Sequence, residues 1–243
     1  MKYFVISDIH SNYDALKAFA DFIKPLFSAG DVLFCLGDLI GYGPEPSECI
    51  SWIADKCDYV ISGNHERMLL DKTLREFAND IARRAIEWAD EKLSGGEKSY
   101  LKKLPDMADT GIRIILAHGS PEDPDEYILR HSQAMSAITM MRTLKRSICF
   151  FGHTHIPGIF SEAGYSYVPG VKINLEKDNY YLINPGSIGQ PRDRDSRSSF
   201  CILDGDMLDV TFYRIPYDID NVSRKIKEAG LPIELGERLY FGV

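Results

Sequence analysis

Short apolar segments alternate with amphipathic segments along most of the chain. Five runs are rich in Val, Ile and Phe and have little polar alternation, as strands covered on both faces do. They span residues 3–7, 32–36, 59–61, 112–117 and 148–151. Helical patterns lie between and beside them, at Tyr13–Ile23, Pro46–Lys56, 78–93 and 132–146. This order predicts a sheet of parallel strands with helices packed against it.

The last third of the chain has a different pattern. Closely spaced apolar runs with Gly, Asn and Asp between them are typical of antiparallel strands. They span residues 157–160, 165–168, 180–183, 200–203 and 208–214. We therefore expect a second sheet rich in antiparallel pairs, followed by a helix over residues 218–229. No repeat or linker interrupts the pattern, which predicts a single domain over residues 1–243 with two packed sheets.

Charge and composition exclude several classes of partner. The chain has 28 Lys and Arg against 36 Asp and Glu, a net charge of −8 without a cationic block. We therefore expect no long nucleic acid as main partner. The longest apolar run, residues 32–37, has six residues, whereas a membrane span needs roughly 18 or more, so we expect no membrane partner. Assembly of identical chains into a homo-oligomer stays open.

The cysteines and the first residues predict a cytoplasmic location. Five cysteines are an odd number and contain no CxxC pair, which is typical of free thiols in a reduced protein rather than of a disulfide framework. The first residues lack the apolar core of about 7–15 residues that a signal peptide needs.

Polar residues gather directly after the apolar runs. In open α/β sheets, ligands bind beyond the carboxyl ends of the strands. Five of the six histidines lie at these ends: His10, His65, His118, His153 and His155. Unrelated surface or core histidines do not explain five at one structural position. His131, the sixth, is expected at the surface where a helix starts.

The set of polar residues indicates a metal site. Its seven candidate ligands are Asp8, His10, Asp38, Asn64, His118, His153 and His155. Imidazole, carboxylate and amide oxygen together suit Mn, Fe, Ni or Zn. Seven ligands exceed one tetrahedral site but suffice for two divalent ions if one carboxylate bridges. Such a pair, about 3.5–4 Å apart, binds a phosphate and activates the hydroxide that attacks it in line. The sequence thus predicts a dinuclear hydrolase.

Five ordered motifs make the chain resemble the calcineurin-like metallophosphoesterases. They are DIH (8–10), GD (37–38), GNHE (63–66), HG (118–119) and GHTH (152–155). Two neighbouring strings, HGSPEDP (118–124) and NPGSIGQPRD (184–193), resemble the small prokaryotic phosphodiesterase branch. The resemblance covers residues 2–204. It implies an α/β fold, a four-layer α/β/β/α sandwich of two mixed β-sheets flanked by helices, with the metals at the rim.

The resemblance also implies roles for single residues. It assigns Asp8, His10 and His155 to one ion, Asn64, His118 and His153 to the other, and Asp38 to both. His65 matches a catalytic histidine that lies over the substrate and stabilises or protonates the leaving oxygen. Glu66 matches a supporting residue.

One departure from the family pattern bears on the substrate. In the phosphoprotein phosphatases of this superfamily, the GD motif continues with an Asp that orients the catalytic histidine and an Arg that grips phosphate. Gly41 and Tyr42 stand at those positions here. Without that Arg, a dianionic monoester loses a bidentate partner, which favours phosphodiesters.

A further expectation concerns the turn at residues 191–197, which carries three arginines. Arg192 is the candidate for contacting a substrate phosphate through its two-pronged guanidinium. The alternative is a solvated loop with internal ion pairs. Residues 184–187 either line the site or turn the chain.

Three functions remain in view. The first is a metal-dependent phosphodiesterase acting on a small or nucleotide-like phosphoester. The second is a dinucleoside-polyphosphate hydrolase, a phosphomonoesterase or a protein phosphatase that uses the same metals. The third is a non-catalytic scaffold, as in a retromer subunit of this fold that has lost a metal-ligating histidine. Every ligand position is filled here, which argues against the scaffold.

Overall fold

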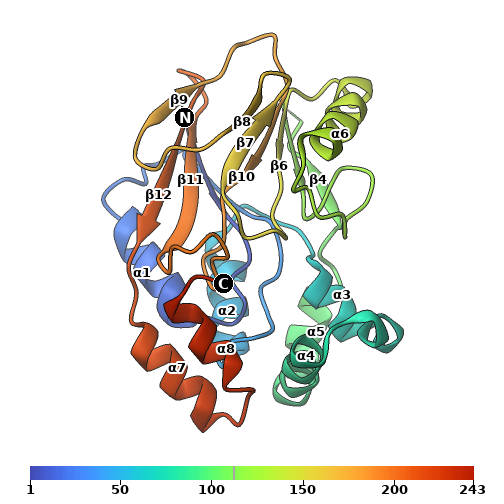
Figure 1. The fold of residues 1–243 in the computed structure, drawn as a ribbon, viewed down its shortest axis with the longest axis vertical. Helices are drawn as coiled ribbons and strands as arrows, with labels where there is room; N and C mark the ends of the chain where they lie inside the picture. Colours follow the sequence, from blue (N-terminus) through green and yellow to red (C-terminus); the bar gives the residue numbers. More distant parts are fainter. Residues whose placement is uncertain (112) are drawn as a thin grey trace.

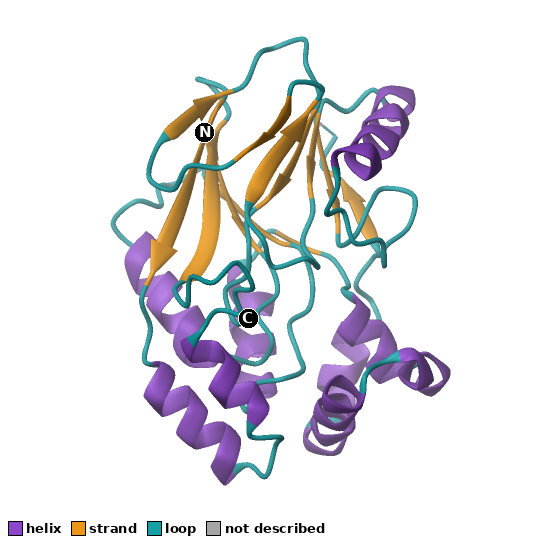
Figure 2. Ribbon diagram, viewed as in Figure 1, coloured by secondary structure: helices purple, strands orange, loops and turns teal. Residues whose placement is uncertain are grey.

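The computed structural model describes residues 1–111 and 113–243. Among them, twelve strands form two six-stranded mixed sheets, and helices surround the sheets (Figures 1 and 2). The first sheet has the order β3 (Tyr59–Val60), β2 (Val32–Cys35), β1 (Lys2–Ile6), β11 (Ser198–Asp204), β12 (Asp209–Ile215) and β9 (Lys172–Asn174). The second has the order β4 (Met107–Asp109), β5 (Ile114–Ala117), β6 (Ile148–Phe150), β10 (Tyr181–Asn184), β7 (Gly158–Ser161) and β8 (Gly164–Ser166).

The helices lie outside the two sheets and around their lower end in Figure 1. The α-helices are α1 (Tyr13–Ile23), α2 (Pro46–Lys56), α3 (Asn64–Leu70), α4 (Asp80–Lys92), α5 (Gly95–Leu101), α6 (His131–Leu144), α7 (Ile219–Glu228) and α8 (Glu234–Glu237). Two short 3₁₀ helices, η1 (Lys72–Phe77) and η2 (Arg238–Tyr240), complete the set that the described residues form.

The core is layered because strand side chains alternate between two buried faces. Along β1, Tyr3 and Val5 belong to the apolar cluster between the two sheets, whereas Phe4 and Ile6 belong to the cluster that includes α1 and α2. On the other side, Ile138 of α6 packs in a cluster with residues of β5, β6 and β10. The four-layer α/β/β/α sandwich expected from the resemblance is therefore confirmed.

Local signals predicted several helices accurately. Helices α1 and α2 have the expected bounds, and Asn12 caps α1 by accepting a hydrogen bond from the Ala15 N–H at 3.1 Å. Helix α6 begins at His131, which is exposed as expected. Position 112, the expected start of one strand, lies outside the described residues. The patterns did not predict α3, α5, α8, β4 and β9, which are three to seven residues long.

The predicted division of strands between sheets was wrong. The early runs do not share one parallel sheet, and the late runs do not form a separate one. Strand β1 pairs with β2 in parallel and with the late strand β11 antiparallel. Strand β6 likewise pairs in parallel with β5 and with the late strand β10. The apolar pattern of a run indicates that both faces of the strand are buried. Strands of either sheet are buried in this way, so the pattern does not show which strands pair.

This topology brings the functional motifs together despite that error. Strands β1, β2 and β3 are parallel in one sheet, and β5, β6 and β10 are parallel in the other. The residues that follow β1, β2, β5 and β6 meet at one rim, at the lower ends of the strands in Figure 1. The C-terminal segment with α7 and α8 lies beside this rim.

Two observations bear on the surroundings of the chain. The five cysteines are free thiols, as expected, four of them buried and Cys57 half-buried. Within the described residues, no helix combines the length and apolarity required to traverse a lipid bilayer.

Candidate metal centre

All seven candidate ligands converge at the rim and form two groups that share one carboxylate. Donor atoms within each group lie within 4.8 Å of one another. The first group is Asp8, His10, Asp38 and His155, and the second is Asp38, His118 and His153. Asn64 extends the second group, because its Oδ1 lies 3.1 Å from His118 Nε2. The structure thus brings together every residue that the sequence nominated as a ligand.

Most of these residues have a left-handed backbone, which side chains other than glycine rarely adopt. The φ angles are 54° for Asp8, 50° for His10, 52° for Asp38, 64° for His153 and 59° for His155. Each such residue costs about 1–3 kcal/mol, and such residues cluster at functional sites. Backbone hydrogen bonds hold them, for example from the His10 N–H to the Asp38 carbonyl at 2.9 Å.

Each carboxylate has one oxygen fixed by the backbone and the other directed at histidines. Asp38 Oδ1 accepts a hydrogen bond from the His65 N–H at 2.9 Å. Its Oδ2 lies 3.6 Å from His10 Nε2 and 3.4 Å from His118 Nε2, between the two groups. Asp8 Oδ2 accepts from the His153 N–H at 3.2 Å, and the buried Asp8 Oδ1 lies 3.2 Å from His155 Nε2. The second oxygen of each is therefore placed to bind a cation.

Three histidines have their ring orientation fixed by main-chain carbonyls. Nδ1 lies 3.2 Å from the Ile40 oxygen in His10, 2.7 Å from that of Leu36 in His118 and 2.5 Å from that of Gln190 in His155. With the proton on Nδ1, each ring donates to the carbonyl and leaves the Nε2 lone pair for a metal. The buried His153 Nε2 has no hydrogen-bond partner at all.

The protonation states also suit a cation. Burial opposes the charge of Asp38, but His118 and the other imidazoles around it hold the pKa of that carboxyl well below its usual range. Burial lowers the pKa of His10 well below its usual range and that of His153 to about 3. Burial opposes protonation of His118 as well, but the adjacent Asp38 and Asp8 raise its pKa to about 9. A cation would displace that proton.

Glu66 holds the backbone around Asp38 and is completely buried. Its carboxylate accepts hydrogen bonds from the N–H groups of Asp38, Leu39, Ile40 and Gly63 at 2.8–3.2 Å. Burial and the nearby Asp38 carboxylate raise the pKa of Glu66 to about 7, and the backbone donors oppose this shift. Glu66 thus fixes the loop that carries Asp38, the supporting position that the resemblance implied.

His65 lies over the shared carboxylate. Its Nε2 is 4.0 Å from Asp38 Oδ2. Its ring packs between His10 and Tyr42, with centroids 4.6 Å from each. The buried Nδ1 has no hydrogen-bond partner, so packing rather than a carboxylate orients the ring. Burial lowers the pKa of His65 to about 4, which makes the ring neutral at pH 7.

Arg192 reaches the same rim. Its guanidinium lies 5.7 Å from the centre of the Tyr42 ring and donates to Gln190 Oε1 at 2.9 Å. No carboxylate of the described residues forms an ion pair with it. The neighbouring Arg197 instead pairs with Asp195 at 2.6 Å. Arg197 thus belongs to a solvated ion pair, whereas Arg192 lies beside Tyr42, and its contact with a substrate phosphate stays a prediction.

The C-terminal segment supports the centre through Tyr42. Leu235 and Leu239 are buried in one apolar cluster with Tyr42 and with Ala82 of α4. Because Tyr42 packs against His10, this cluster holds one side of the candidate centre. Sequence patterns gave no role to these last residues.

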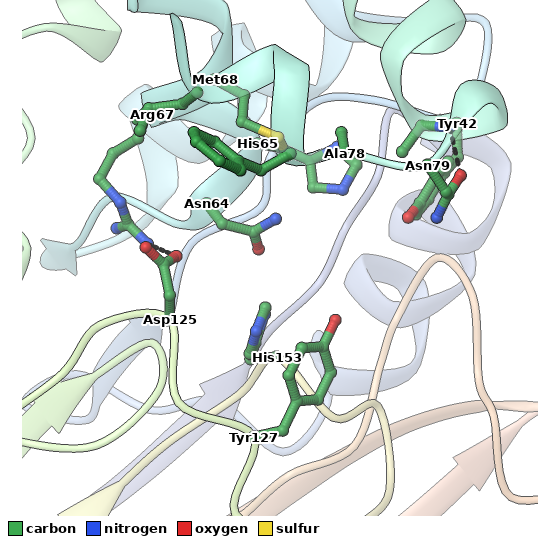
Figure 3. Close-up of a pocket in the computed structure, with 13 residues that line it drawn as sticks. Tyr42, Asn64, His65, Arg67, Met68, Ala78, Asn79, Asp125, Tyr127 and His153 are labelled. Carbon is green, nitrogen blue, oxygen red and sulfur yellow. Dashed lines mark hydrogen bonds and ion pairs between the residues drawn. The ribbon is translucent and has the colours of Figure 1, made fainter.

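A cavity of about 420 Å³ opens beside the centre (Figure 3). Asn64, His65 and His153 form the end nearest the candidate ligands. Tyr127, whose ring centre lies only 3.8 Å from that of His153, was not among the residues nominated from the sequence. Its only sequence signal is its position a few residues after the HG motif. An ion pair between Arg67 and Asp125 lies at the left of the cavity in Figure 3, across from Tyr42 and Asn79.

Comparison with known proteins agrees with this geometry. Residues 1–207 match the family model of the calcineurin-like phosphoesterase superfamily domain. An uncharacterised protein of Methanocaldococcus jannaschii is 36% identical over 242 residues, which cover 98% of this chain and 97% of that protein. The chain therefore belongs to the calcineurin-like phosphoesterase superfamily, and the resemblance drawn from its motifs is confirmed.

Solved structures extend the comparison. The crystal structure of a metallophosphoesterase from Sphaerobacter thermophilus has a TM-score of 0.88 and 32% identity, with all of both chains covered. A hypothetical protein of Pyrococcus horikoshii has a TM-score of 0.81 and 23% identity, with 100% of this chain and 98% of that one covered. The second likeness concerns the fold alone.

Proposed function

We propose that the chain is a dinuclear-metal phosphodiesterase that acts on small or nucleotide-like phosphodiesters. One observation carries the proposal: the Asp38 carboxylate belongs to both donor groups, and each group offers histidine nitrogens within 4.8 Å of it. A carboxylate so placed suits a bridge between two cations. The buried His153 Nε2, which has no hydrogen-bond partner, supports the same interpretation, because buried polar atoms normally have partners.

The donor set favours divalent transition metals. Asp8, His10 and His155 would hold one ion, and Asn64, His118 and His153 the other. Mixed nitrogen and oxygen ligands suit Mn, Fe, Ni or Zn better than Mg or Ca. Such ions supply Lewis-acid charge for the phosphoryl oxygens and acidify the attacking water.

The remaining residues would act on the substrate. His65 is neutral and buried next to the shared carboxylate, so it would donate a hydrogen bond to the leaving oxygen. Arg192 lacks a carboxylate partner among the described residues and would contact a nonbridging phosphoryl oxygen. Tyr42 holds both of these side chains in place through its ring.

Diesters are favoured over monoesters for an electrostatic reason. A monoester carries a second negative charge, for which the phosphoprotein phosphatases use an additional Arg at the position of Tyr42. Here Arg192 is the one guanidinium of the described residues that we assign to the phosphate. A phosphodiester carries one negative charge, which the Arg192 guanidinium alone can balance.

A paired assay tests the proposal. Bis(p-nitrophenyl) phosphate and p-nitrophenyl phosphate share a leaving group, and kcat/KM for each is measured with Mn²⁺ added and after chelation. We expect turnover that chelation abolishes and a higher kcat/KM for the diester. A monoester preference of about tenfold or more would favour a phosphatase. Absence of turnover of both esters with every candidate metal would favour the scaffold. Dinucleoside polyphosphates, assayed in parallel, address the remaining alternative.

A further inference from the structure

The cavity beside the candidate centre has an apolar wall that core packing does not explain. Phe77 lines this cavity although 87% of its surface is exposed. Leu74, Met68 and Ala78 line it alongside Phe77. A large aromatic side chain that is exposed to water at the entrance of a cavity indicates a binding site. Scattered apolar residues on the surface do not.

A buried arginine holds this wall in place. Arg75 lies in the same 3₁₀ helix, η1, and is 7% exposed. Its Nε donates to the Met68 carbonyl at 2.7 Å, and its Nη2 donates to the Leu69 carbonyl at 2.6 Å and to Asp90 of α4 at 2.9 Å. The turn that carries Phe77 is therefore tied to α3 and α4, so the wall is formed before any ligand arrives.

An aromatic side chain also lines the cavity near the candidate ligands. The Tyr127 ring lies at 38° to that of His153, with centroids 3.8 Å apart, and 46% of the tyrosine is exposed. Figure 3 shows Tyr127 and His153 side by side below Asn64 and His65. A group bonded to a phosphate at the centre would enter the cavity between these residues and the apolar wall.

Polar groups in the cavity are largely committed to the protein. Arg67 forms ion pairs with Asp125 and, at 3.4 Å, with Asp106. Asn79 Oδ1 accepts the hydrogen bond that caps α4, from the Ala82 N–H at 2.9 Å. The cavity therefore offers ring faces and hydrocarbon to a planar group, beside the Tyr127 hydroxyl and the Asn79 amide nitrogen as polar neighbours.

From these observations we infer that the cavity binds a planar aromatic substituent of the phosphoester, such as an aryl ring or a nucleobase. The inference rests on the proposed function for the position of the phosphate and adds the class of group attached to it. The volume of about 420 Å³ lies in the range of roughly 300–1,000 Å³ that small-molecule sites occupy. A short alkyl group would leave most of this apolar surface in water.

Two inert phosphonates test the inference. Phenylphosphonate and methylphosphonate share the phosphoryl anion and differ in the carbon substituent, and calorimetry on the Zn²⁺-loaded full chain gives both Kd values. We expect phenylphosphonate to bind at least about tenfold more tightly, from burial of the ring. Phe77→Ala should weaken phenylphosphonate about 3–10-fold and leave methylphosphonate unchanged, the range for loss of one aromatic contact.

Matched variants separate this effect from a general loss of structure. Met207 is 65% exposed in the turn between β11 and β12, so Met207→Ala should change neither Kd. Tyr127→Phe keeps the ring and should keep the preference, whereas Tyr127→Leu should reduce it.

The outcomes distinguish this inference from the proposed function. Equal binding of the two phosphonates by the unaltered chain, or equal effects of Phe77→Ala and Met207→Ala, would overturn the aromatic subsite while leaving diester hydrolysis in place. If neither phosphonate binds, the placement of the phosphate is wrong and the inference falls with it. The metal-dependent diester assay then decides the proposed function separately.

Discussion

Gly41 lies directly against the imidazole of His65. A Cβ built on Gly41 would lie 2.8 Å from His65 Cε1 and closer still to Nδ1. Gly41 also has a φ of 88°, which disfavours any other residue. At this position the phosphoprotein phosphatases have an Asp that orients the histidine. Here the backbone itself fills the space, and the histidine Nδ1 stays without a partner.

Replacement of Gly41 by alanine should therefore displace His65. We expect Gly41→Ala to retain both metals and to lower kcat on a diester by roughly tenfold or more, part of the 10²–10⁴-fold worth of such a group. Metal analysis and steady-state kinetics measure the two effects. Gly230 provides a control, because its φ is 73° but a Cβ there would meet nothing within 4 Å. If Gly41→Ala and Gly230→Ala retain equal activity, contact with His65 is not what requires glycine at position 41.

The candidate ligands could be predicted from sequence because their signal is local. Asp8 and His10 follow a short apolar run, and the same is true of Asp38, so each position could be identified without knowing which strands pair. The residues that follow β1, β2, β5 and β6 meet at one rim, so the error in sheet assignment did not affect the site. The cap of α1 is local in the same way, because Asn12 accepts from the Ala15 N–H three positions further on.

Other parts of the site depend on contacts between distant segments. Tyr127 meets His153 only because the loop after β5 folds back over the end of β6. Tyr42 is held by Leu239, almost 200 residues away in the chain. Phe77 would appear from its sequence neighbours to be an ordinary apolar residue of a helix. Sequence periodicity carries no information on contacts between distant segments. The cavity and the residues that support the candidate metal centre could therefore not be predicted from the sequence.

Asp38 should affect both metals, whereas His155 should affect mainly one. In Asp38→Ala, the carboxylate oxygen between His10 and His118 is lost, so we expect occupancy to fall at both positions and turnover to disappear. In His155→Ala, one ion should be weakened more than the other. Elemental analysis of metal per chain, together with diester turnover, tests this. His131→Ala is the control, because this exposed histidine lies at the start of α6. Two ions per chain and near-normal turnover in Asp38→Ala would contradict the bridging role.

Asp14 should stabilise the chain in a pH-dependent way. Burial opposes its charge, but hydrogen bonds from Lys17 and Lys225 hold its pKa below the ordinary value of 3.8. A lowered carboxyl pKa stabilises the folded state above the ordinary value, and this contribution is lost as the pH falls through the lower folded pKa. We expect Asp14→Asn to lower the free energy of unfolding by about 1–2 kcal/mol at pH 7, as for loss of one buried charged partner.

Urea unfolding of the Asp14 variant at pH 7, 5 and 3.5 checks the sign. The difference from the unaltered chain should be constant between pH 7 and 5 and should shrink at the lowest pH. Asp80→Asn serves as a control, because the Asp80–Arg83 pair is exposed and exposed pairs contribute about 0–1 kcal/mol. A difference that grows toward pH 3.5 would contradict the lowered pKa of Asp14.

His65 should contribute to the departure of the leaving group and not to metal binding. Its side chain follows Asn64 directly but lies over Asp38, with Nε2 4.0 Å from Oδ2. A neutral imidazole there donates one hydrogen bond to the oxygen on which negative charge develops. We expect His65→Asn to retain both ions and to lower kcat by about 10²–10⁴-fold on an alkyl or nucleoside diester.

The choice of ester then distinguishes the possible roles of His65. A p-nitrophenolate departs readily as its anion and needs less stabilisation, so the defect of His65→Asn should be smaller on p-nitrophenyl diesters than on alkyl diesters. Loss of metal from the variant would instead make His65 a ligand. An equal defect across leaving groups would show that it stabilises charge on the nonbridging phosphoryl oxygens. Steady-state kinetics with a series of methyl diesters, whose leaving groups differ in pKa, separates these three outcomes when the metal content of the variant is measured as well.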